Sequence, residues 1–113
     1  MVKKNYVPGR GDIVWLNFNP QSGHEQKGKR PAVVLSPKEY NEKTGLGLFC
    51  PITSIIKDYP FEVKLENKKI NGVVLSDQIK NLDWKTRKIE FITKITPEKF
   101  EEIIDKIGLL LFE

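Results

Sequence analysis

Two residues of this chain, Arg30 and Thr53, have the types and the settings needed to hold a small anion. Arg30 ends a polar, basic loop and is followed at once by Pro31 and an apolar run, so it stands at a rigid junction between loop and strand. Thr53 ends a later apolar run. A guanidinium donates paired hydrogen bonds to phosphate oxygens and stays charged, and a threonine hydroxyl can add another donor. The pattern therefore predicts an anion site if the fold brings the two residues together.

These residues belong to a series of motifs that covers nearly the whole chain. The motifs are Gly11-Asp12-Ile13-Val14-Trp15, Glu25-Gln26-Lys27-Gly28-Lys29-Arg30-Pro31-Ala32-Val33-Val34-Leu35, Pro51-Ile52-Thr53-Ser54, Tyr59-Pro60-Phe61-Glu62-Val63 and Gly72-Val73-Val74-Leu75-Ser76-Asp77-Gln78-Ile79-Lys80. In this order and spacing, the sequence resembles the MazF/PemK family of ribosome-independent mRNA endonucleases, the toxin halves of bacterial toxin–antitoxin pairs. The resemblance implies an SH3-like barrel with added helices, and a homodimer.

The resemblance also implies an enzyme that cuts single-stranded RNA at specific sequences without a metal, leaving 2′,3′-cyclic phosphate and 5′-hydroxyl ends. Such a reaction uses the 2′-hydroxyl of the substrate as nucleophile and passes through a doubly charged phosphorane. Arg30 is the strongest candidate for stabilising that charge, because a preorganised donor can be worth about 10²–10³ in rate. Thr53 matches the catalytic hydroxyl of the family, and Ser54 is a candidate second donor.

The groups that transfer protons are harder to assign. The resemblance implies that the motif arginine, Arg30, takes part, although a guanidinium resists deprotonation up to about pH 12. Glu25 lies in the same loop and is the alternative, either as the base or as a residue that holds Arg30 in place. The only histidine, His24, is expected to be exposed and without a catalytic role, since the family pattern requires no histidine there.

Binding a single strand of RNA needs further cations, aromatic rings and polar groups. The candidate phosphate contacts are Lys27, Lys29, Lys80, Arg87 and Lys88, each with solvation on the surface as the alternative. The candidate platforms for unstacked bases are Phe18, Tyr59 and Trp84, of which Trp84 fits a place in the core equally well.

Four polar residues complete the predicted site, and the residue types needed to hold a metal are missing from it. Asp77 and Gln78 are predicted either to read base edges or to stabilise their loop. Asn17 and Asn19 flank Phe18 where many relatives carry aspartates, so the cleavage sequence of a relative does not transfer. With one histidine, one cysteine and no zinc-ligand spacing, we expect no metal site and no cofactor.

Short apolar segments, most of them with a period of two, predict the strands that position these residues. The expected strands are Ile13 to Phe18, 31–36 (buried on both faces), 46–53, 61–65, 73–75 and 89–95. The expected turns between them include Pro8-Gly9, Ser36-Pro37, Thr44-Gly45 and Asn71-Gly72. Short strands and frequent turns indicate a small, strongly curved sheet or barrel.

One helix is expected at the C-terminus, with Thr96 as its cap and Pro97 in its first position. Apolar residues then recur every three or four positions from Phe100 to Leu111, which predicts a stripe that packs on the sheet or on a second subunit. Gly108 either ends this helix or lies inside it. The residues alone thus predict a mainly β (α+β) chain with a C-terminal amphipathic helix.

With 113 residues, the chain is predicted to be one domain, 1–113, with room for one modest core. No apolar run is as long as a membrane span, and the first residues lack the apolar stretch of a signal peptide. We therefore expect a cytoplasmic protein without membrane association. The single cysteine, Cys50, excludes an internal disulfide and is expected to be a buried structural thiol.

The net charge of +4 is concentrated within residues 1–30, because the basic and acidic groups of the remaining residues balance. This distribution fits a surface for a polyanion, and solvated surface lysines are the alternative. The resemblance implies a second partner, a cognate acidic antitoxin of the MazE kind. Its flexible tail would fold over the RNA groove, with the basic 27–30 loop as one landing point.

Two rival functions remain open for the sequence. One is a non-enzymatic toxin of the same barrel class that poisons DNA gyrase through its C-terminal residues. Here the C-terminal segment 109–113 has the apolar character of a packed helix end, and the Arg30–Thr53 pair would have no purpose. The other is an SH3-like module that binds RNA or peptide without cleaving it.

Overall fold

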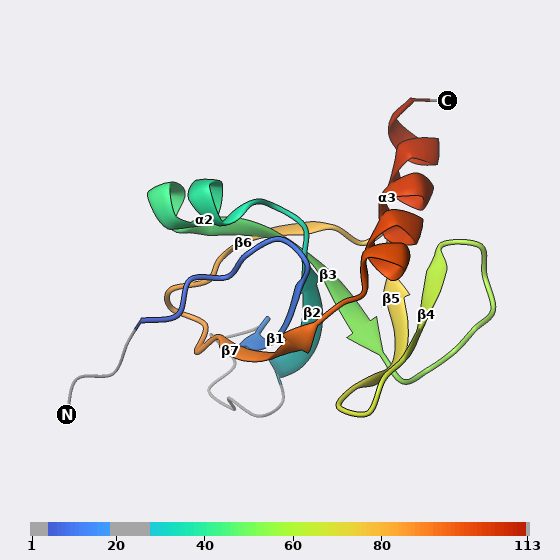
Figure 1. Cartoon of the computed structure of the whole chain (residues 1–113), viewed down its shortest axis with the longest axis horizontal. Helices are drawn as coiled ribbons and strands as arrows, with labels where there is room; N and C mark the ends of the chain where they lie inside the picture. Colours follow the sequence, from blue (N-terminus) through green and yellow to red (C-terminus); the bar gives the residue numbers. More distant parts are fainter. Residues whose placement is uncertain (1–4, 19–27, 113) are drawn as a thin grey trace.

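The computed structural model describes residues 5–18 and 28–112 (Figure 1). Within these ranges the strands are β1 (Asp12–Asn17), β2 (Lys29–Val34), β3 (Leu46–Thr53), β4 (Glu62–Glu66), β5 (Asn71–Leu75), β6 (Lys80–Asp83) and β7 (Glu90–Lys94). The helices are α2 (Lys38–Thr44) and α3 (Pro97–Leu111). The prediction of a mainly β chain with a C-terminal helix is confirmed.

The described strands pair antiparallel in a single curled sheet with the order β4-β5-β3-β2-β1-β7. The long strand β3 is the pivot of this sheet. Its first half pairs with β6, its middle with β2 and its last two residues, Ile52 and Thr53, with β5. Because β3 changes partners along its length, the sheet bends around it and forms a half-barrel (Figure 1).

Each face of the central strands packs into its own apolar cluster, because successive side chains of a strand point to opposite faces. One cluster contains Ile13, Val33 and Cys50, and α3 covers it with Ile103 and Ile107. The second cluster lies on the other face and consists of Val14, Leu16, Ala32, Val34, Phe49 and Trp84. The prediction that the segment after Arg30 is buried on both faces is therefore confirmed. Burial also raises the pKa of the Cys50 thiol to about 12, which makes this thiol unreactive.

Helix α3 begins as the sequence predicts. The Thr96 hydroxyl accepts a hydrogen bond from the backbone N–H of Lys99 at 3.3 Å, and Pro97 occupies the first turn. Gly108 lies inside the helix, which continues to Leu111. Only part of the apolar stripe meets the sheet. The exposed apolar residues of the helix and its end are Ile104, Leu109, Leu110, Leu111 and Phe112.

Two elements were not predicted, and one predicted turn is wrong. Strand β6 has a single apolar residue, Leu82, and α2 has no apolar stripe, so neither carries a clear pattern. Helix α2 is anchored by the buried side chain of Asn41. The pair Asn71-Gly72 starts β5 and forms no turn, since Gly72 is placed opposite Leu65 in the sheet. No helix among the described residues is long and apolar enough to span a membrane.

Candidate functional site

The register of β2 and β3 brings Arg30 and Thr53 together. Ala32 lies opposite Pro51 in the last pair of this antiparallel register, and Arg30 and Thr53 each lie two residues beyond that pair, Arg30 on β2 and Thr53 on β3. Both side chains then share the sheet face of the second apolar cluster, because Ala32 of that cluster comes two residues after Arg30 and Phe49 four residues before Thr53. The apolar series on each strand thus ends in a polar residue at the same edge of the core.

A hollow of about 560 Å³ opens at this edge. Its lining residues are Phe18, Arg30, Pro51, Ile52, Thr53, Leu75, Gln78, Lys80 and Leu82. A smaller hollow of about 160 Å³ shares Thr53, Leu75 and Gln78 with the first and extends it to Lys57, Tyr59 and Glu62. We call the two together the Arg30–Thr53 groove. Strands β2 to β6, the β3–β4 and β5–β6 connections and the end of β1 build it, so its shape depends on the whole curl of the sheet.

The two central side chains of the groove can both donate hydrogen bonds to a ligand. Arg30 is exposed, and among the described residues no carboxylate forms an ion pair with its guanidinium. The Thr53 hydroxyl accepts a hydrogen bond from the Ile55 backbone N–H at 3.1 Å, which leaves its own hydrogen for a ligand. Such a strand-end bond was the alternative to a catalytic role for Thr53, and the geometry allows both.

Lys80, Gln78 and Phe18 join them from three different segments. Lys80 pairs with Phe49 across β6 and β3, which puts its side chain on the groove face of the sheet. Phe18 directly follows β1 and borders the second apolar cluster. An ammonium, a carboxamide and an aromatic ring therefore surround the Arg30–Thr53 pair, a combination that suits a phosphate with an attached base.

Other predicted binding residues lie outside the lining of the groove. Asn17 is paired with Lys29 and, by alternation along the strands, both point to the sheet face opposite Arg30. The ammonium of Lys29 forms an ion pair of 2.9 Å with Glu90. Ser54 is exposed but does not line either hollow. The structure therefore does not bring these three residues to the anion site.

Arg87 supports the wall of the groove from behind. Its guanidinium donates to the carbonyl oxygens of Asp83, Asn17 and Phe18 at 2.9, 3.1 and 2.9 Å. In return, the Asn17 backbone N–H donates to the carbonyl oxygen of Arg87 at 2.8 Å. The end of β1, and with it the Phe18 ring, is thus fastened to the β6–β7 connection.

The Asp77 carboxylate accepts a hydrogen bond of 2.6 Å from the hydroxyl of Tyr59, which ties the β3–β4 loop to the β5–β6 connection. This bond is the main cause that raises the pKa of Tyr59 to about 12. The contact favours the loop-stabilising alternative for Asp77 and leaves its neighbour Gln78 in the groove. Trp84 is buried, and its Nε1–H donates to the carbonyl oxygen of Asn41, so core packing is the correct alternative for this ring.

Four predicted residues, Glu25, His24, Lys27 and Asn19, lie outside the described part of the chain. Groove residues that the sequence analysis did not select include Lys57, Glu62 and the apolar walls Leu75 and Leu82. Of these, Glu62 and Leu75 had a signal, because they lie in the Tyr59–Val63 and Gly72–Lys80 motifs. Within residues 5–18 and 28–112, no three His, Cys, Asp or Glu side chains cluster as metal ligands would.

Comparison with known proteins gives the groove a context. A family model described as "PemK-like, MazF-like toxin of type II toxin-antitoxin system" matches residues 9–111. The chain is 46% identical over 106 residues to the endoribonuclease toxin MazF of Escherichia coli K12, which covers 94% of this chain and 96% of the relative.

Solved structures agree with the sequence matches. Crystalline MazF from Deinococcus radiodurans superimposes with a TM-score of 0.86 at 49% identity, covering 96% of this chain and 100% of that one. MazF in a MazE–MazF crystal structure from the same organism gives 0.85 at 44% identity, covering 96% and 98%. The curled, SH3-like sheet expected from the sequence matches the fold of these solved structures. By sequence and by fold, the chain belongs to the family of PemK-like, MazF-like toxins of type II toxin–antitoxin systems.

Proposed function

We propose that this chain is an endoribonuclease toxin that cuts single-stranded RNA at specific sequences without a metal, leaving 2′,3′-cyclic phosphate and 5′-hydroxyl ends. The observation that carries the proposal is that Arg30 of β2 and Thr53 of β3 line one groove, together with Phe18, Gln78 and Lys80. The names of the relatives, endoribonuclease toxins, support the same activity.

In this proposal Arg30 and Thr53 bind the two non-bridging oxygens of the scissile phosphate. The guanidinium fork and the hydroxyl hydrogen become most effective when the phosphorane gains its second negative charge, so they stabilise the transition state more than the substrate. Lys80 neutralises a neighbouring phosphate, Phe18 stacks on a base and Gln78 contacts a base edge. Arg87 holds Phe18 in place from behind.

Proton removal from the 2′-hydroxyl is assigned to the Glu25 carboxylate as the base, and the alternative role of Glu25 is to hold Arg30 in place. A carboxylate can accept a proton near neutral pH, whereas a guanidinium cannot release one. A Glu25→Gln variant that cleaves at the full rate would exclude the base role. A bell-shaped pH–rate profile that loses its acidic limb in this variant would support it.

We also propose two protein partners and a cytoplasmic site of action. The first partner is a cognate acidic antitoxin of the MazE kind, which crystal structures of the Deinococcus relative contain. The basic residues of the groove are its landing points, so that the antitoxin competes with RNA. The second partner is another copy of this chain, bound through the exposed apolar end of α3.

The deciding experiment incubates the purified chain with a long RNA of varied sequence in EDTA, beside an Arg30→Ala variant, and maps the fragment ends. We expect discrete cuts from the wild type with cyclic phosphate at the 3′ ends, and none from the variant. Intact RNA with a folded, antitoxin-free chain would contradict the proposal. It would favour a gyrase poison or a binding module, which a DNA gyrase cleavage assay would separate.

A further inference from the structure

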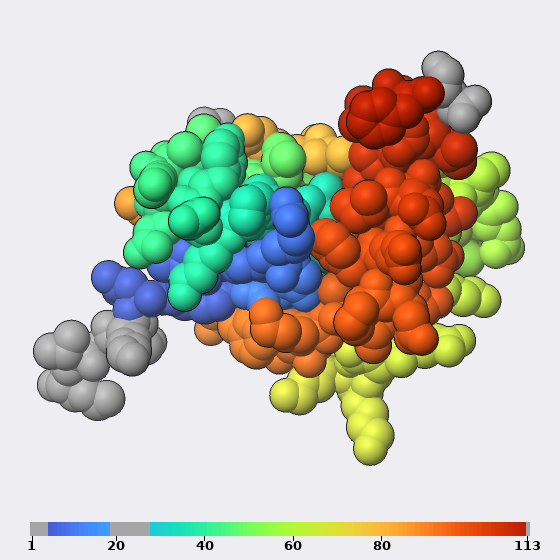
Figure 2. Space-filling model, turned by 45° about the horizontal axis from the view of Figure 1, so that its top comes forward, coloured from blue at the N-terminus to red at the C-terminus, as the bar shows by residue number. Residues whose placement is uncertain are grey.

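A second hollowed face lies away from the Arg30–Thr53 groove. Two neighbouring hollows of about 720 and 560 Å³ share the lining residues Asn5, Tyr6 and Phe91. None of their lining residues belongs to the Arg30–Thr53 groove. Figure 2 shows the N-terminal segment (blue) between α2 (green) and β7 (orange). We call this hollowed surface the N-terminal groove.

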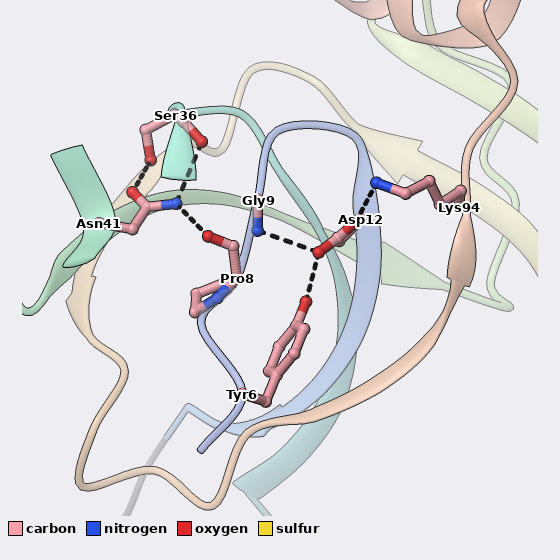
Figure 3. A network of polar contacts seen from close by, with 7 residues as sticks. All are labelled: Tyr6, Pro8, Gly9, Asp12, Ser36, Asn41 and Lys94. Carbon is pink, nitrogen blue, oxygen red and sulfur yellow. Dashed lines mark hydrogen bonds and ion pairs between the residues drawn. The ribbon is translucent and has the colours of Figure 1, made fainter. Parts of the chain in front are cut away.

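A buried polar network fixes the shape of the N-terminal groove (Figure 3). The Asp12 carboxylate, only 4% exposed, accepts hydrogen bonds from the Tyr6 hydroxyl at 2.5 Å and the Gly9 backbone N–H at 2.9 Å. It also forms an ion pair of 2.8 Å with Lys94. The Asn41 side chain donates to the carbonyl oxygen of Pro8 at 2.8 Å, which ties the same segment to α2. The groove is therefore preorganised.

An aromatic pair forms part of its wall. The rings of Tyr6 and Phe91 lie 5.9 Å apart between centroids at an angle of 56°, so the tyrosine, itself held by Asp12, steadies the phenylalanine. Phe91 belongs to β7, which ends the sheet, and it is 49% exposed. A half-exposed ring in a fixed position is a platform on which a base can stack.

The charge of the N-terminal groove is mainly positive. Its lysines are Lys38, Lys85, Lys88 and Lys94, and its carboxylates are Asp12 and Glu90. Both carboxylates are already matched, Asp12 by Lys94 and Glu90 by Lys29. Lys38 and Lys85 come from α2 and the β6–β7 connection and approach the groove from two sides. A polyanion therefore complements this surface.

The β6–β7 connection joins the two grooves. Leu82 lines the Arg30–Thr53 groove, and Trp84 and Lys85, a few residues further on, line the N-terminal groove. Both grooves also border the second apolar cluster, at Phe18 on one side and at Tyr6 on the other. An extended strand that leaves the first groove along this connection would reach the second.

We propose that the N-terminal groove binds a flanking segment of the RNA whose scissile phosphate lies between Arg30 and Thr53. Lys38 and Lys85 contact backbone phosphates, and a base of the flank stacks on Phe91. A single-stranded nucleic acid fits better than an acidic peptide, because the surface combines cations with an aromatic platform and not cations alone. This inference rests on the proposed function and adds a second contact region to it.

The test compares cleavage of a short oligonucleotide that contains only the recognition sequence with a longer RNA that carries the same sequence between flanks. The variants are Phe91→Leu, which keeps apolar bulk without the ring, and the exposed double substitution Lys38→Gln with Lys85→Gln. For the long RNA, we expect KM to rise about 5- to 100-fold in Phe91→Leu, as for loss of one stacked base. In the double variant, the slope of the logarithm of RNA affinity against the logarithm of salt concentration should become shallower by about 1.4, because two phosphate contacts are lost. A matched control is Lys68→Gln, at an exposed position near the β4–β5 turn.

The short oligonucleotide provides the internal reference. A KM increase confined to the long RNA supports the inference, and equal effects on both RNAs, or none on either, overturn it. A second experiment tests the groove without cleavage. Fluorescence anisotropy measures how tightly the long RNA binds to the Arg30→Ala chain, with and without the added Phe91→Leu substitution. If the wild type cleaves neither RNA, the proposed function fails, and the anisotropy comparison still decides for or against this groove. Weakened binding of an acidic peptide but unchanged RNA binding in the double variant also overturns it.

Discussion

Single residues in the Arg30–Thr53 groove divide into those that face the ligand and those that hold them. Arg30 and Thr53 line the groove and carry polar hydrogens that can be donated to the ligand. Arg87 does not line the groove and instead donates hydrogen bonds to three backbone carbonyl oxygens. This division predicts different kinetic signatures, because a donor to the phosphorane acts on kcat and a wall support acts on substrate binding.

The first prediction concerns Thr53. In Thr53→Val, which is nearly isosteric, kcat for RNA cleavage should fall about 10²- to 10³-fold, since a preorganised donor to the phosphorane is lost. Thr53→Ser should recover most of the rate, because it restores both the donor and the acceptor for the Ile55 N–H. Single-turnover cleavage in EDTA measures both variants. A serine variant as slow as the valine variant would mean that the hydroxyl is not the source of the effect.

The second prediction concerns Arg87. In Arg87→Lys the charge remains, but one ammonium cannot replace the planar fork that spans the Asp83, Asn17 and Phe18 carbonyls. We expect KM to rise more than kcat falls, because the Phe18 wall moves while Arg30 and Thr53 keep their strand positions. Steady-state kinetics on one oligonucleotide provides the measurement, with Lys68→Arg, at an exposed position outside both grooves, as the control. A fall in kcat alone would instead indicate a direct contact of Arg87 with the reacting phosphate.

At the scale of single residues, the sequence predicted the Arg30–Thr53 site but not the role of Arg87 in holding the wall of the groove. Arg30 and Thr53 lie in short motifs whose residue types reveal their chemistry. The partners of Arg87 are carbonyl oxygens, which every residue has, so no side-chain pattern marks them. The sequence also allowed the prediction that Lys29 points away from the groove. Neighbouring residues of a strand point to opposite faces, and Arg30 faces the groove.

At the scale of elements, the sheet depends on places where strands approach closely. Sequence patterns predicted the strands with apolar alternation and the capped helix α3, because their burial is periodic. They missed β6 and α2, whose stability comes from pairing with β3 and from the buried hydrogen bonds of Asn41. Tertiary partners of this kind leave no local period in the sequence.

The third prediction follows from Gly72, which lies in β5 beside the end of β3 and has φ of +132°. A Cβ atom there would come within 2.4 Å of the Thr53 carbonyl oxygen, so Gly72→Ala requires the end of β3 to move. We expect a loss of stability of about 1–3 kcal/mol, together with a fall in kcat, because the displaced residue carries the proposed catalytic hydroxyl. Urea unfolding and single-turnover cleavage measure the two effects. Asn71→Ala, the exposed neighbour in the same strand, is the control. Full activity in Gly72→Ala would show that the position of Thr53 tolerates this shift.

At the scale of the whole molecule, the apolar surface exposed on α3 lies apart from the two grooves, which no residue of α3 lines. Ile104, Leu110, Leu111 and Phe112 extend along α3 beyond the sheet that covers its inner face, and none of them lines either groove. Figure 1 shows the end of α3 projecting away from the half-barrel. A helix end that exposes several large apolar side chains beside each other is stable in water mainly when a partner covers it.

The last prediction is that this end of α3 holds two copies of the chain together. A double substitution, Leu110→Glu with Leu111→Glu, should convert a dimer into monomers of 13.0 kDa, because each copy would bring two like charges into the symmetric contact. Sedimentation velocity over a range of concentrations measures the mass, and circular dichroism verifies that the helix remains. Glu101→Gln, an exposed polar position on the same helix, should leave the dimer intact. A wild-type chain that sediments as a monomer at about 10⁻⁵ M, far above the dissociation constant of a stable dimer, would contradict the prediction. The apolar end would then be assigned to the antitoxin, whose affinity for the double variant can be measured directly.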